Sequence, residues 1–161
     1  MRWSVVVAGI CISFLSGTAS AAEGDISAER GAQIAITHGC HDCHTEGYME
    51  SDGKIDPAKA LKGTAMGWRG PWGTTYALNL RLTVVEKAKT EDEFVNFAKT
   101  FKARPPMPWY NVHAMDESDL RSLYQYIKSL GEPGEQAPQA VGPGEEPKTP
   151  YFLQQPTPPK G

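Results

Sequence analysis

The chain has 161 residues, of which 22% are charged and 40% hydrophobic, and its net charge at pH 7 is −3. This length suits one domain with a short extension and excludes two domains of ordinary size. Because the charge is mildly negative, we expect no nucleic acid among the partners, since proteins that bind nucleic acid carry a basic surface.

The first 21 residues have the pattern of a secretory signal peptide. Arg2 precedes an apolar run over residues 5–15, and small residues follow as far as Ala21 in an A-x-A cleavage site. The apolar run is too short for a comfortable membrane span, although an uncleaved anchor is the alternative. We therefore expect cleavage near Ala21, a periplasmic location if the source is a bacterium, and no stable membrane insertion after cleavage.

A helix is expected from a cap at Ser27 to about His38. Very small side chains recur along one of its faces, at Ala28, Gly31, Ala32 and Ala35. Such a stripe allows another helix to cross closely. Gly39 is then expected to end the helix and to lead the chain into the next segment.

A C-x-x-C-H run follows at residues 40–44, with Cys40, Cys43 and His44 at its defining positions. Two thiols at this spacing can each add across a vinyl group of one porphyrin, and the histidine directly after them then lies under the iron. The motif predicts one haem c, bound covalently through Cys40 and Cys43, with His44 as the proximal iron ligand. The other ring nitrogen of His44 is expected to donate to a carbonyl that the sequence does not identify.

Three other interpretations of this motif are a disulfide, a redox C-x-x-C and half of a zinc site. A zinc site needs a second Cys/His pair at ligand spacing, which His38, His41 and His113 do not provide. A thioredoxin-like site needs a preceding strand, whereas the residues before Cys40 have a helical pattern. Haem attachment is therefore the preferred interpretation.

Helical periodicity fades between Thr45 and Lys89, where glycine, proline and aromatic residues accumulate. We expect a long loop that packs on the porphyrin, because a loop of this length is otherwise unusual in a compact domain. Arg69 and the side-chain donors of the aromatic residues are candidates for hydrogen bonds to haem propionates. The candidate wall residues are Trp68, Trp72, Tyr76, Leu78 and Leu80.

Two further helices are predicted. The first begins with a capping box formed by Thr90 and Glu93. Its apolar face consists of Phe94, Phe97, Ala98 and Phe101. The second is expected from Asp116 to about Leu130, and its apolar side chains are the expected partners of the small-residue stripe. They are Leu120, Leu123, Tyr124, Ile127 and Leu130.

Between these two helices lies the segment Arg104-Pro105-Pro106-Met107-Pro108-Trp109. Its prolines remove backbone donors and fix φ, so we expect a stiff extended loop here. Such a loop would hold one methionine sulfur at a fixed distance, and Met107 is the candidate distal iron ligand. The competitors are Met66, His113 and Met115, of which Met115 is better explained as a hydrophobic staple at the start of the last helix.

Residues 132–161 are rich in Pro, Gly, Gln and Glu. They contain little to bury apart from Tyr151, Phe152 and Leu153, so we expect a disordered, polyproline-like tail. The alternative is that these three residues dock onto a larger complex. The expected organisation is a signal peptide over residues 1–21, one domain over residues 22–131 and a tail over residues 132–161.

The C-x-x-C-H motif after a short helix, a methionine in a proline-flanked loop and a closing helix resemble a class I monohaem cytochrome c. The resemblance covers about Ala28 to Leu130. More narrowly, residues 71–80, 105–109 and 115–120 are similar to the cytochrome c domains of membrane-associated dehydrogenase cytochrome subunits. The sequence departs from these domains at Arg81-Leu82-Thr83, where they tend to have a turn with proline and acidic residues.

The resemblance implies an all-α, class I cytochrome c fold, with three or more helices wrapped around one covalently attached haem. It implies a soluble carrier of single electrons that cycles between Fe(III) and Fe(II) with His/Met ligation and transforms no substrate. The expected partners are redox proteins, such as a dehydrogenase, an oxidase or another cytochrome. Two alternatives stay open: an electron-transfer subunit of a dehydrogenase complex, and a haem enzyme or gas sensor with a labile sixth ligand.

Overall fold

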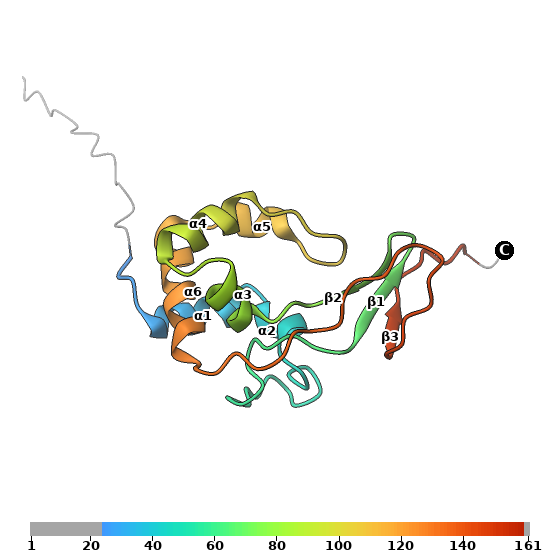
Figure 1. Cartoon of the computed structure of the whole chain (residues 1–161), viewed down its shortest axis with the longest axis horizontal. Helices are drawn as coiled ribbons and strands as arrows, with labels where there is room; N and C mark the ends of the chain where they lie inside the picture. Colours follow the sequence, from blue (N-terminus) through green and yellow to red (C-terminus); the bar gives the residue numbers. More distant parts are fainter. Residues whose placement is uncertain (1–23, 160–161) are drawn as a thin grey trace, which may run out of the picture.

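The computed structural model describes residues 24–159, so the expected signal peptide over residues 1–21 lies outside the described part. In this part six helices gather at one end of the molecule and a small sheet projects from the other (Figure 1). None of these helices is long and apolar enough to cross a lipid bilayer. The helices are α1 (Ala28–Thr37), α2 (Cys40–His44), α3 (Leu80–Glu86), α4 (Glu91–Thr100), α5 (Trp109–His113) and α6 (Glu117–Ser129), and the strands are β1 (Gly67–Gly70), β2 (Gly73–Tyr76) and β3 (Tyr151–Leu153).

Helix α1 begins where the sequence predicts. The Ser27 hydroxyl accepts a hydrogen bond from the backbone N–H of Arg30, which satisfies one of the free donors of the first turn. After the helix, Gly39 has a left-handed backbone with a φ of 67°. A side chain is strained in that conformation, so glycine lets the chain turn directly from α1 into α2.

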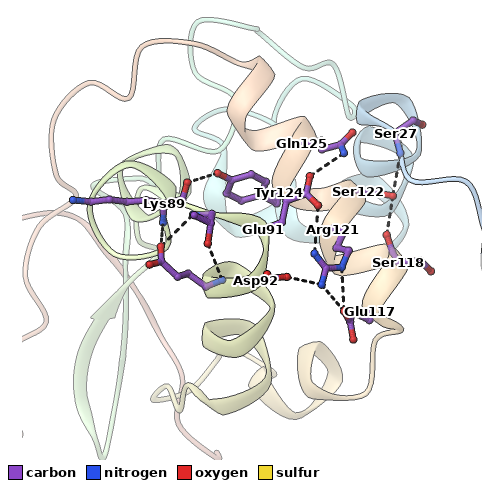
Figure 2. Close-up of polar contacts among 12 residues, drawn as sticks. Ser27, Lys89, Glu91, Asp92, Glu117, Ser118, Arg121, Ser122, Tyr124 and Gln125 are labelled. Atoms are coloured by element: carbon purple, nitrogen blue, oxygen red, sulfur yellow. Dashed lines mark hydrogen bonds and ion pairs between the residues drawn. The ribbon is translucent and has the colours of Figure 1, made fainter.

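Helices α1 and α6 cross closely at the centre of the core. A Cβ atom at Gly31 would lie 2.0 Å from the backbone oxygen of Ser122, so only glycine fits at the crossing. The backbone N–H of Ser27 donates to the Ser122 hydroxyl at 3.3 Å (Figure 2). The predicted pairing of the small-residue stripe with the last helix is therefore confirmed. The core around the crossing includes Ile34, Ala35, Leu120, Leu123, Tyr124 and Ile127.

Helix α4 lies against α6 and starts with the predicted capping box. The Thr90 hydroxyl accepts from the N–H of Glu93, and the Glu93 carboxylate accepts from the N–H of Thr90. Phe94 and Ala98 are buried on the side of α4 that faces the core. The Arg121 guanidinium of α6 also forms ion pairs with the carboxylates of Glu91 and Asp92 in α4 and of Glu117 in α6 (Figure 2).

The stretch between Thr45 and Lys89 is not the continuous loop that the sequence suggested. Strands β1 and β2 form an antiparallel hairpin in it, and helix α3 follows. The Asn79 side chain caps α3 by accepting from the N–H of Leu82. Two strands of four residues and a helix of seven are too short to produce a clear hydrophobic period, which explains the error.

The disorder predicted for residues 132–161 is also wrong where the structure describes this segment. Strand β3 pairs with β1 in parallel and completes a sheet with the order β2-β1-β3. On the other edge, Val141 exchanges two backbone hydrogen bonds with Thr74. The Phe152 ring packs on Trp68 with 6.4 Å between centroids. An extended segment rich in proline needs no core of its own when its backbone pairs with a neighbouring strand.

Candidate functional site

The C-x-x-C-H motif forms helix α2, which places both thiols on one face because residues three apart on a helix are neighbours. Cys40 and Cys43 are half-buried and are not joined in a disulfide. Burial raises the pKa of the Cys40 thiol to about 11 and also raises the pKa of Cys43, so both thiols are neutral. Within residues 24–159 no three His, Cys, Asp or Glu side chains gather into a possible metal site.

His44 is buried, and one hydrogen bond fixes its ring. Nδ1 lies 2.7 Å from the backbone carbonyl oxygen of Leu78. A carbonyl only accepts, so Nδ1 carries the proton and the lone pair of Nε2 is available. Burial lowers the pKa of His44, which keeps the ring neutral. The carbonyl that the sequence could not identify is therefore that of Leu78.

A short segment around Gly63 brings the Leu78 carbonyl to α2. The N–H of Gly63 donates to the His44 carbonyl at 2.8 Å, and the N–H of Leu80 donates to the Leu61 carbonyl at 2.9 Å. A Cβ atom at Gly63, where φ is +78°, would lie 2.5 Å from a backbone oxygen of the neighbouring loop. This support was not predicted from the sequence, in which Gly63 is the one residue that indicates a close approach.

His41 lies between the two cysteines and is fully buried. Its Nδ1 is 2.7 Å from Thr45 Oγ1, and its Nε2 is 3.3 Å from the hydroxyl of Tyr126 in α6. Burial lowers the pKa of His41. Both ring nitrogens are engaged, so His41 connects α2 to α6 and has no nitrogen free for a metal.

Met107 lies in the segment between α4 and α5, apart from the other predicted site residues. Its side chain is half-buried, and its carbonyl accepts a hydrogen bond from the N–H of Trp109 at 2.9 Å. In Figure 1 this segment lies in the upper part of the view, whereas α2 lies in the lower part. The structure thus gathers Cys40, Cys43 and His44 on one helix and holds Met107 on a separate segment.

Two of the three competing ligands are used elsewhere. His113 Nε2 contacts the Phe101 carbonyl at 2.8 Å. Met115 is only 6% exposed and belongs to the core cluster at the start of α6, which agrees with its predicted role as a staple. Met66 is half-buried directly before β1. Of the four candidate ligands named from the sequence, Met107 and Met66 remain without another described role.

The polar groups of the hairpin divide into two kinds. Tyr76 shares a hydrogen bond of 2.7 Å with the Thr149 hydroxyl, and Arg69 forms an ion pair of 2.5 Å with Glu146. Both side chains bond to the C-terminal segment. This observation does not support the predicted hydrogen bonds from Arg69 and Tyr76 to haem propionates. The indole Nε1 of Trp72, in contrast, is buried without a partner among the described residues.

Comparison with known proteins identifies the family. The family model described as cytochrome c matches residues 28–131, which is more than half of the 161 residues. The chain belongs to the cytochrome c family. The six helices and small sheet of residues 24–159 form a class I cytochrome c fold, and haem c is bound covalently through Cys40 and Cys43. No curated protein and no solved structure matches the chain.

This cytochrome c works in haem-based electron transfer. The bound haem supplies the Fe(III)/Fe(II) couple. The residues present fit that group: two unpaired sulfur atoms on one face of α2, and a neutral histidine ring beside them with Nε2 unprotonated. The hydrogen bond from Nδ1 to Leu78 orients the ring and raises the basicity of its free nitrogen.

Proposed function

We propose that this cytochrome c is a periplasmic carrier of single electrons whose iron is held by His44 and Met107. The hydrogen bond from His44 Nδ1 to Leu78 supports the proposal most strongly, because it leaves Nε2 free on a ring of fixed orientation. Met107 would supply a neutral thioether, which favours ferrous iron and raises the reduction potential above that of bis-histidine ligation. Two ligands that stay bound in both oxidation states keep the rearrangement during electron transfer small.

The carrier exchanges electrons with redox proteins during brief encounters at an exposed porphyrin edge and transforms no substrate. The periplasmic location rests on the signal-peptide pattern of residues 1–21. A dehydrogenase, an oxidase or another cytochrome would serve as donor or acceptor. A mildly acidic chain with a net charge of −3 suits encounter with basic surfaces on these partners.

Carbon monoxide tests the sixth ligand directly. The absorption spectrum of the reduced holoprotein is recorded with and without the gas for wild type, Met107→Ala and the matched control Met66→Ala. We expect carbon monoxide to change only the spectrum of Met107→Ala, because removal of the thioether opens one iron position. If wild type binds the gas readily, the iron is open and the protein is a haem enzyme or gas sensor. If Met66→Ala alone binds it, Met66 is the ligand.

A second candidate is an electron-transfer subunit of a larger dehydrogenase complex. The observation that favours it is the exposure of three apolar residues on β3, where Tyr151, Phe152 and Leu153 are 37%, 47% and 61% exposed. Docking through this strand predicts copurification with a dehydrogenase, reduced by Leu153→Ser at the most exposed position. A protein that purifies alone, with unchanged behaviour of Leu153→Ser, supports the free carrier.

A further inference from the structure

Asn79 joins the C-terminal segment to the start of α3. Its Nδ2 donates to the carbonyl of Pro133 at 2.6 Å and to the carbonyl of Glu135 at 2.9 Å. Its Oδ1 accepts from the N–H of Leu82 at 3.0 Å. The side chain is 1% exposed, and each polar atom has a partner. The amide therefore has one orientation, with nitrogen toward the C-terminal segment and oxygen toward the helix.

The residue before Asn79 provides the carbonyl that fixes His44. The Leu78 C=O belongs to the same planar peptide unit as the N–H of Asn79, so the position of Asn79 determines where that carbonyl points. The Leu78 side chain does not hold this peptide in place, because it is 40% exposed. The anchored side chain next to the peptide is that of Asn79.

Arg81 strengthens the same connection from two residues further along. Its guanidinium group is buried and donates only to backbone carbonyls. Leu130 and Glu132 accept on the side of the C-terminal segment, and Pro57 and Ala60 accept on the side of the loop after α2. Arg81, at the start of α3, thereby connects the first residues after α6 to the loop after α2.

We propose that Asn79 is a positioning residue for His44, and that residues 133–135 of the C-terminal segment hold Asn79 in place. The proposal rests on the proposed role of His44 as the proximal ligand. A carbonyl kept at 2.7 Å from Nδ1 fixes the ring and increases its basicity toward the iron. Residues beyond the last helix thus act on the iron ligand through two hydrogen bonds and one peptide unit.

The test is nitrogen-15 and proton NMR of the ferric holoprotein with labelled histidine. Asn79→Asp and Asn79→Ser keep an oxygen that can cap α3 but lose both donors to Pro133 and Glu135. Tyr76→Phe is the matched control, since it removes a contact with the C-terminal segment at Thr149 and leaves Asn79 intact. In both Asn79 variants we expect the hyperfine shift of the His44 Nδ1 proton to change and this proton to exchange with solvent about tenfold faster. In Tyr76→Phe we expect neither change.

Each other outcome is decisive. If the His44 Nδ1 proton keeps its wild-type shift and exchange rate in both Asn79 variants, the positioning role is overturned. The role is also overturned if the core amide protons of α6 exchange faster by the same factor, because that result indicates a general loss of stability. If Asn79→Asp fails to take up haem, Asn79→Ser decides alone. If wild type has no hyperfine-shifted histidine N–H, His44 is not the ligand, and the proposed ligation fails before the role of Asn79 arises.

Discussion

His41 and His44 lie three residues apart in α2, yet the groups around them assign the two rings different tasks. Both nitrogens of His41 face hydrogen-bonding partners, Thr45 on one side and Tyr126 on the other. His44 has one such partner, the carbonyl of Leu78, and keeps Nε2 free. A histidine acts as a metal ligand only through an unprotonated nitrogen that nothing else engages. The motif predicts His44 as the ligand, and of these two rings only that of His44 keeps a nitrogen free for the proposed ligation.

Acidification should destabilise the holoprotein through His41. Burial lowers its pKa, so the folded state binds fewer protons at this site than the unfolded chain, where histidine titrates near pH 6.5. Its contribution to stability is complete above pH 6.5 and decreases as the pH falls toward the lowered folded pKa, by at most about 1.4 kcal/mol per pH unit for one proton. Chemical denaturation at a series of pH values measures this slope. His41→Gln should have a smaller slope, and equal slopes would exclude His41 as the cause.

At the scale of elements, the crossing of α1 and α6 depends on the absence of a side chain. Gly31 has no Cβ atom, and this lets the backbone of α6 approach until Ser122 contacts it directly. Arg30 and Asp119 form an ion pair beside the crossing. Close backbone contact and the apolar packing around it fix how α1 and α6 lie against each other.

Replacement of Gly31 by alanine should separate α1 from α6. The new Cβ atom would lie 2.0 Å from the Ser122 carbonyl oxygen and 2.7 Å from Tyr126 Cβ, so the helices must move apart. We expect a loss of about 1 to 3 kcal/mol or more in the free energy of unfolding, measured by urea titration of the holoprotein. Gln33→Ala, on the exposed face of α1, is the control and should change this free energy by less than about 0.5 kcal/mol. Equal effects of the two substitutions would argue against a close crossing.

The sequence predicts some of these elements far better than others, for physical reasons. Helices α1, α4 and α6 are ten residues or longer, have recognisable caps and show a clear apolar face. The hairpin and α3 are short, so no period could identify them. The partner of His44 was out of reach because every residue carries a backbone carbonyl, and only the folded arrangement of the chain, which includes the close approach at Gly63, brings the carbonyl of Leu78 to the ring.

At the scale of the whole molecule, the C-terminal segment completes the sheet that the domain begins. An isolated two-stranded hairpin is marginally stable in water, and β3 supplies a third strand to β1. Arg69 and Tyr76 add side-chain bonds to Glu146 and Thr149 on this segment. The helical core and the sheet are thus stabilised by different parts of the chain.

A chain that ends at Val141 should keep its helical core and lose order in the hairpin. Residues 133–135 and their bonds to Asn79 remain, whereas β3 and the partners of Arg69 and Tyr76 are removed. We expect amide exchange in β1 and β2 to become at least about tenfold faster, with exchange in α1 and α6 unchanged. Hydrogen exchange followed by mass spectrometry measures both regions at once. Uniform acceleration across the chain would show that the two parts are stabilised together.

The crossing of α1 and α6 also sets an order of events during synthesis. Ser27 and Ser122, which meet at this crossing, are 95 residues apart in the chain. A chain that emerges from the ribosome N-terminus first cannot close its core until α6 has followed. The roughly 80 residues after Cys43 take roughly 4 to 16 s to add at about 5 to 20 residues per second. Throughout that interval His41 lacks its partner Tyr126, so Cys40 and Cys43 on either side of it lie on a segment that is not yet packed against α6.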